Sequence, residues 1–206
     1  MTDTLYNELT VSDFTIRIYQ GPIGCSVSGG ADSSLLMYVL MKYAPGPLTF
    51  YTTDSKPWPN RIAGIRKVYD KCIELTQRHD TRLVETVIEG QQARDNIFLT
   101  PKKDVEDKKI NVCYTGMTRN PTEDLGHDDE KMTIRDGEPN KEVVTRNFYV
   151  PFINSDKKTV AQLYRHFDLM ESLYPLTFSC TKSTTDKHCN SCWWCAERKW
   201  AFGRLI

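Results

Sequence analysis

The stretch that decides the fold is IGCSVSGGADSS, residues 23–34. Its first five residues are small and apolar, which suits a buried parallel strand, and a helix is predicted over 33–43. The loop between them carries the adjacent glycines Gly29 and Gly30. Strand, glycine loop and helix N-terminus in this order predict an anion site, because glycine lets backbone N–H groups approach a ligand closely.

Strands alternate with helices outward from this stretch. Residue patterns predict strands over 14–19, 48–53, 83–88 and 110–116, and helices over 60–79, 91–99 and 160–173. The charged run 102–109 is typical of a solvated loop. The order predicts an α/β fold, a Rossmann-like and mostly parallel sheet with helices on both faces that binds ligands at the carboxyl ends of its strands.

Composition narrows the class of protein. The chain has 206 residues, of which 39% are apolar and 26% charged, and its formal net charge is zero. Such a charge balance argues against a nucleic acid as the main partner. No apolar run is long enough to span a bilayer, and the first residues do not resemble a secretory signal. We therefore expect a cytoplasmic protein that has no membrane partner.

The glycine loop also carries three hydroxyls and one carboxylate. Ser28, Ser33 and Ser34 add donors to the unpaired N–H groups of the first helical turn, which suits a phosphate. Asp32 would repel that phosphate unless it holds Mg²⁺ against it. A tight turn with a helix cap is the plainer alternative. The pattern is neither that of a Walker P-loop nor that of a dinucleotide fingerprint.

Four of the seven cysteines lie in the last 27 residues of the chain, spaced as Cys180-x8-Cys189-x2-Cys192-x2-Cys195. Four thiolates at this spacing predict a closed, tetrahedral and structural Zn²⁺ site. An iron–sulfur cluster is the alternative, although the Cys-Pro continuation of bacterial ferredoxins is absent.

Two motifs together resemble one known family. Residues 28–33 match Ser-Gly-Gly-x-Asp-Ser, the signature of the PP-loop ATP pyrophosphatase superfamily. The tail looks like the end of the 7-cyano-7-deazaguanine (preQ0) synthases of queuosine biosynthesis. The matching tail residues are Thr177, Ser179, Cys180, Cys189, Cys192, Cys195, Arg198, Ala201 and Phe202. The segment 151–153 and Lys157 resemble the family's Pro-Leu/Phe-Ile segment and the lysine that follows it.

The resemblance implies an ATP-dependent C–N ligase. ATP would be cleaved between its α- and β-phosphates, the AMP would activate a deazapurine-like acid such as 7-carboxy-7-deazaguanine, and ammonia would follow. The expected ATP-binding residues are Ser28, Gly29, Gly30, Asp32, Ser33, Ser34, Thr52 and Asp54. Asp32, Ser33 and Lys157 are the candidate catalytic residues, with Asp32 on Mg²⁺ and Lys157 neutralising phosphate. An exposed lysine near a helix start is the plainer alternative for Lys157.

Departures from the family fall where the acceptor should bind. Residues 52–54 are Thr-Thr-Asp in place of Tyr-Gly-Gln, and the segment after Gly116 also differs. Thr52 and Asp54 are expected to meet adenosine, and Arg119 to meet the acceptor's carboxylate. A PP-loop sulfur transferase, a sulfonucleotide-reductase-like enzyme and a nucleotide-binding module with a zinc lobe remain alternatives.

The predicted organisation is a PP-loop domain over 1–175 and a zinc-binding lobe over 176–206 that packs on it. Residues 118–146 are predicted to form a substrate loop or lid, with plain disorder as the alternative, and a hairpin could join 132–135 to 143–146. The strand at 14–19 is a candidate for a contact between two copies of the chain or for pairing within it.

Overall fold

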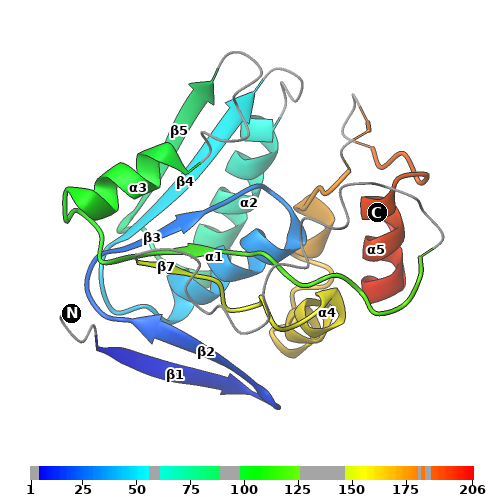
Figure 1. Cartoon of the computed structure of the whole chain (residues 1–206), viewed down its shortest axis with the longest axis horizontal. Coiled ribbons are helices and arrows are strands. Elements are labelled where there is room, and N and C mark those ends of the chain that lie inside the picture. Colours follow the sequence, from blue (N-terminus) through cyan, green and yellow to red (C-terminus); the bar gives the residue numbers. More distant parts are fainter. Residues whose placement is uncertain (1–4, 56–60, 89–97, 126–146, 181, 184–186) are drawn as a thin grey trace.

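The computed structural model describes residues 5–55, 61–88, 98–125, 147–180, 182–183 and 187–206 (Figure 1). The elements in chain order are β1 (Tyr6–Val11), β2 (Phe14–Tyr19), β3 (Ile23–Ser26), α1 (Ala31–Tyr43), β4 (Leu48–Ser55), α2 (Arg61–Thr76), β5 (Thr81–Ile88), α3 (Leu99–Glu106), β6 (Val112–Thr115), β7 (Phe148–Tyr149), α4 (Lys157–His166), the 3₁₀ turn η3 (Tyr174–Leu176) and α5 (Trp193–Phe202). Every helix in the described ranges is too short or too polar to cross a bilayer.

The main sheet is parallel and confirms the predicted α/β class. Its strand order is β5-β4-β3-β6-β7, and each neighbouring pair runs parallel. The chain leaves β3 towards β4 on one side and later returns to β6 on the other. The point where this order reverses lies between β3 and β6, where open α/β sheets bind their ligands.

Helices cover both faces of this sheet, as predicted. Helices α1, α2 and α4 belong to the larger core, while α3 lies across the opposite face above a smaller cluster (Figure 1). Helix α1 is buried along almost its whole length. It therefore provides a rigid support for the loop that precedes it, because a helix packed on all sides has little freedom to shift.

The strand predicted at 14–19 forms a hairpin outside the main sheet. Strand β2 pairs antiparallel with β1, so its partner lies within the chain. The hairpin is joined to the sheet through Tyr114, whose hydroxyl accepts from the Tyr19 N–H and donates to the Arg17 carbonyl. The sequence patterns did not predict β1, since its side chains are mostly exposed and show no apolar alternation.

Four element predictions need correction or fall outside the described residues. The charged run 102–109 is not simply a solvated loop, because α3 extends through Glu106 and turns Val105 towards the smaller core cluster. The helix predicted over 160–173 begins earlier and stops at His166, and Asp168 then adopts a positive φ of 56°. Most of the helix predicted over 91–99 and the whole predicted hairpin at 132–146 lie outside the described residues.

Candidate nucleotide site and thiolate cluster

The glycine loop lies at the carboxyl end of β3, at the reversal point of the sheet. Gly29 has a φ of +78°, a left-handed conformation that favours glycine, and Gly30 is the extended N-cap residue of α1. Gly30 provides no side-chain cap to the helix. The first turn of α1 therefore presents backbone N–H groups without a side-chain acceptor at the cap, which is the arrangement that binds anions at helix N-termini.

The three loop serines have different roles in the structure. Ser28 is exposed, and its Oγ lies 3.1 Å from that of Ser33. Both serines line a cleft beside the loop, so their hydroxyls are within reach of a ligand there. Ser34 is buried and donates through its Oγ to the Gly30 carbonyl at 2.8 Å. Its hydroxyl holds the loop in shape, since it already has an acceptor within the protein.

The cleft has a volume of about 160 Å³ and opens where β3, β4 and β6 end. Its walls include Thr53, Phe98, Thr115 and Met117 in addition to the loop serines. Gly116 closes the distance between the end of β6 and α1, because a Cβ at this position would lie 2.7 Å from the Ser33 amide nitrogen. Only a residue without a side chain allows this approach.

At the end of β4, the residue that reaches the cleft is Thr53, which lies between the predicted residues Thr52 and Asp54. Thr53 lines the cleft, whereas Thr52 and Asp54 do not. Successive side chains of a strand point to opposite faces, so these two lie on the other side of β4. Thr52 is buried and its Oγ1 has no hydrogen-bond partner in the described structure. The sequence shows that Thr52 and Thr53 point to opposite faces of the strand, but it does not show which of the two faces forms the cleft.

Lys157 is buried and lies beside the start of α1. Its Nζ lies 3.2 Å from Asp32 Oδ2 and 2.9 Å from Glu197 Oε2. The plainer expectation of an exposed lysine is therefore wrong. Asp156 caps α4 by accepting from the Lys158 N–H, and this directs the next side chain, that of Lys157, inward. Glu197 was not among the predicted site residues.

Arg198 completes the buried charged group. It donates to the Tyr174 carbonyl at 3.1 Å, and its guanidinium lies 4.1 Å from the centre of the Tyr174 ring. Burial lowers the pKa of Arg198, while the nearby Tyr174 and Asp32 act to raise it. Lys157, Asp32 and Glu197 are joined by ion pairs beside the glycine loop, and Arg198 is a further buried cation that contacts Tyr174.

Arg119 follows the end of β6 and lies outside the cleft described above. Its side chain is exposed, and its backbone N–H donates to the Ser155 carbonyl at 3.0 Å. It is not among the residues that line the cleft. A role for Arg119 towards the acceptor stays a prediction.

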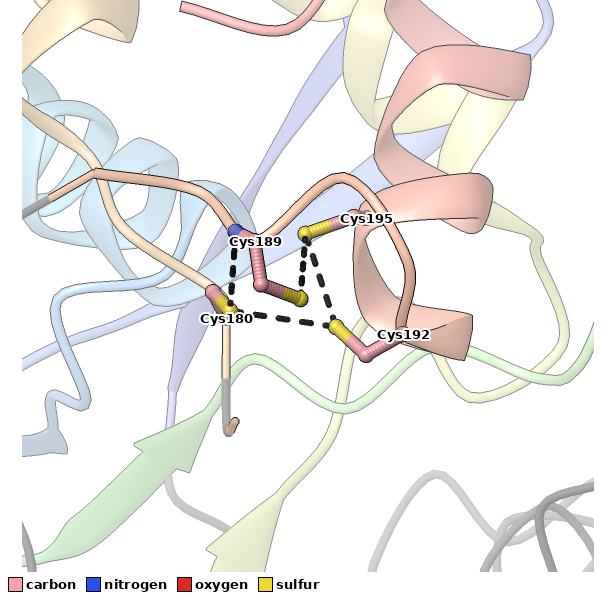
Figure 2. A group of neighbouring side chains, drawn as sticks. All are labelled: Cys180, Cys189, Cys192 and Cys195. Carbon is pink, nitrogen blue, oxygen red and sulfur yellow. Dashed lines mark hydrogen bonds between the residues drawn. The ribbon is translucent and has the colours of Figure 1, made fainter. Parts of the chain in front are cut away.

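The four tail cysteines come together at the start of α5 (Figure 2). Their sulfur atoms all lie within 4.8 Å of one another, and the group could hold a metal ion. Cys192 is the N-cap residue of α5 and Cys195 lies in its first turn, with their sulfurs 3.4 Å apart. Cys180 reaches the cluster from the segment after η3, which also donates the Phe178 N–H to the Gly29 carbonyl at 2.8 Å.

The sulfur distances fit ligation of a single ion. Tetrahedral thiolates around one Zn²⁺, each at about 2.3 Å, lie about 3.8 Å apart. The pairs Cys180–Cys192 and Cys189–Cys195 are separated by 3.8 and 4.0 Å. Thiolates that ligate the separate irons of a cluster lie further apart. His188 lies 3.6 Å from the Cys195 sulfur through Nδ1, and burial lowers its pKa to about 4, so its imidazole is neutral.

The other three cysteines are buried in regular elements. Cys25 lies in β3, Cys72 in α2 and Cys113 in β6, and none is exposed. Burial raises the pKa of all three thiols, in the case of Cys113 to about 12. They are therefore protonated and shielded at neutral pH, as expected for core residues.

The fold is a parallel α/β sheet, and the Ser-Gly-Gly-x-Asp-Ser motif lies at its reversal point, as is typical of PP-loop proteins. Within that class, the family model described as "Queuosine biosynthesis protein QueC" matches residues 129–205. The matched segment contains the cysteine tail, on which part of the resemblance rests, whereas the glycine loop lies outside it.

Comparisons with individual proteins add less. No curated protein matched the chain. Among solved structures, the chain is similar to "U34-tRNA thiolase NcsA from Methanococcus maripaludis with its [4Fe-4S] cluster", at 14% identity and a TM-score of 0.44. The match covers 88% of this chain and 70% of that one. A similarity at this level carries no functional argument.

Proposed function

We propose that the chain is an ATP-dependent C–N ligase of the 7-cyano-7-deazaguanine synthase type. It activates a carboxylate by adenylation, releases pyrophosphate and then admits ammonia. The observation that carries the proposal is the glycine loop, which opens a helix without a side-chain cap at the reversal point of the sheet. Asp32 and Lys157 lie beside it, 3.2 Å apart.

The chemistry explains why ATP is required. A carboxylate is a poor electrophile, since its leaving group would be oxide. Attack of a carboxylate oxygen on the α-phosphorus breaks the α–β bond and releases pyrophosphate, which leaves AMP on the acid. Ammonia then displaces AMP and forms an amide, with loss of one proton. A second ATP adenylates the amide oxygen, with release of pyrophosphate and one proton, and loss of AMP and a second proton then gives the nitrile.

The residues of the chain supply binding and orientation in this scheme. Backbone N–H groups of the loop and the hydroxyls of Ser28 and Ser33 bind the pyrophosphate oxygens as they gain charge. Asp32 would hold Mg²⁺, which supplies charge neutralisation between phosphate oxygens when it is bound. Lys157 adds a fixed positive charge beside the same helix turn. Thr53 and Thr115 line the cleft in which the reacting groups would meet.

Zinc is the proposed ion of the cysteine cluster. The sulfur separations support a single tetrahedral ion, and four thiolates leave no open coordination position. The role would be structural, because binding the ion joins the segment after η3 to the first turn of α5. A sulfur-transfer reaction has less support, since the cysteines outside this cluster are buried thiols with raised pKa values.

A pyrophosphate-release assay tests the proposal. Purified protein with MgATP is offered a panel of small acids, 7-carboxy-7-deazaguanine first, with ammonium or sulfide as the donor. We expect release that depends on an acid, and a nitrogen-containing product with ammonium. Asp32→Asn should abolish release, while Cys113→Ala should retain it. Release with sulfide alone, or loss of turnover in a folded Cys113→Ala protein, would overturn the ligase assignment in favour of sulfur transfer.

A further inference from the structure

Lys157 has two carboxylate partners that differ in access to solvent and ligand. The Asp32 side chain, in the first turn of α1, is 16% exposed and lies next to the glycine loop. The Glu197 side chain, in α5, is fully buried. A ligand in the loop can therefore approach Asp32 directly, but it cannot reach Glu197 without moving α5.

The position of Glu197 is set by the cysteine cluster. Glu197 follows Cys195 by two residues, and both lie in a helix that begins next to Cys192. Helix α4 packs against α5 and brings the Lys157 side chain to Glu197. The contact between these two residues thus joins the tail to the helix that carries the lysine.

A buried ammonium is stable only while a counter-ion remains beside it. If Asp32 were the sole partner of Lys157, drawing Asp32 towards Mg²⁺ would leave the ammonium uncompensated. Glu197 removes this cost, since at 2.9 Å it compensates Lys157 whatever Asp32 does.

The geometry points to Glu197 as a positioning residue that acts through Lys157. It is the constant counter-ion of the lysine, and Asp32 is the exchangeable one, released to Mg²⁺ when MgATP binds. This inference rests on the proposed use of MgATP at the loop. It assigns the cysteine tail a role at the nucleotide site, exerted through a single buried carboxylate.

The test compares two variants of Glu197 that separate charge from shape. Glu197→Gln keeps the volume and removes the charge, whereas Glu197→Asp keeps the charge and shortens the side chain. Glu171→Gln is the matched control, because Glu171 is an exposed carboxylate of the same region that pairs with Arg204. ATP binding to the metal-loaded protein is followed by calorimetry over a Mg²⁺ titration, and the bound metal is quantified in each variant.

We expect Glu197→Gln to raise the half-saturating Mg²⁺ concentration about tenfold or more, because Lys157 then competes with Mg²⁺ for Asp32. Glu197→Asp should recover part of this loss, and Glu171→Gln should match the wild type. If Glu197→Gln had a half-saturating Mg²⁺ concentration close to that of the wild type and Glu197→Asp a raised one, the inference would be refuted, because only the packing of the side chain would then matter. Loss of bound metal in Glu197→Gln would also overturn the inference, as it would make Glu197 a structural residue of the tail.

Thermal unfolding without nucleotide provides a second measurement that is independent of the proposed function. Glu197→Gln should lower the unfolding midpoint by roughly 10 °C, and the partly exposed Asp32, as Asp32→Asn, should lower it less. An equal or larger effect of Asp32→Asn would refute the assignment of Glu197 as the constant partner. If the wild type binds no ATP, the proposed function fails, and the unfolding measurement still decides the pairing.

Discussion

Replacement of Gly116 by alanine tests how closely β6 and α1 must approach. A Cβ at this position would lie 2.7 Å from the Ser33 amide nitrogen and 2.8 Å from the Asp32 carbonyl carbon. Both atoms are backbone, so no side-chain rotation relieves the contact, and α1 or β6 has to move. Overpacking of this kind costs about 1–3 kcal/mol, or about 2–12 °C in the unfolding midpoint of a chain of this size.

The same displacement moves the loop donors away from the phosphates. A misplacement approaching 1 Å can lower turnover about 100-fold, so we expect pyrophosphate release to fall by about 10- to 100-fold in Gly116→Ala. Gly64→Ala is the control, because a Cβ there meets no atom within 4 Å and the residue lies inside α2. It should stabilise the protein by about 0.5–1 kcal/mol, as alanine favours the helix.

Calorimetric unfolding and the release assay, applied to both variants, decide the question. The two alanine substitutions should have opposite signs in stability, and only Gly116→Ala should impair turnover. A Gly116→Ala protein with the midpoint and turnover of the wild type would refute the reasoning, because it would show that α1 and β6 can separate without consequence.

Further outcomes follow from the buried groups. Removal of the metal by a strong chelator should lower the unfolding midpoint and expose four additional thiols to titration; an unchanged midpoint would show that the cluster does not contribute to folding. Cys25, Cys72 and Cys113 should resist alkylation at pH 8.5 in the native protein and react once it is unfolded. The reason is that the raised pKa of each thiol in the folded state keeps the thiolate scarce until much higher pH. Rapid labelling of the native protein, measured by mass spectrometry, would contradict this. Arg198→Lys should lower the free energy of unfolding by about 1–3 kcal/mol in denaturant unfolding, since lysine cannot both stack on Tyr174 and donate to its carbonyl in the same way. An unchanged free energy of unfolding would show that these two contacts do not stabilise the protein.

The sequence by itself determined the sheet and the two motifs. Residues 23–34 indicate strand, loop and helix without reference to the rest of the chain, because small apolar residues, glycines and a helical apolar pattern follow one another directly. The cysteine spacing also predicted the cluster from local sequence, because cysteines with two residues between them lie close together in space. Strand β1 and helix α3 were missed because their patterns are polar, and β7 was missed because it is only two residues long.

Tertiary structure alone decided which side chains meet at the site. Asp32, Lys157 and Glu197 are far apart in the sequence, and they come together only because α1, α4 and α5 pack against one another. Which face of β4 lines the cleft, and therefore that Thr53 lies there, was visible only in the tertiary structure. Local patterns reflect the backbone preferences of neighbouring residues, whereas contacts between distant charges reflect how whole helices pack, and no local pattern encodes that.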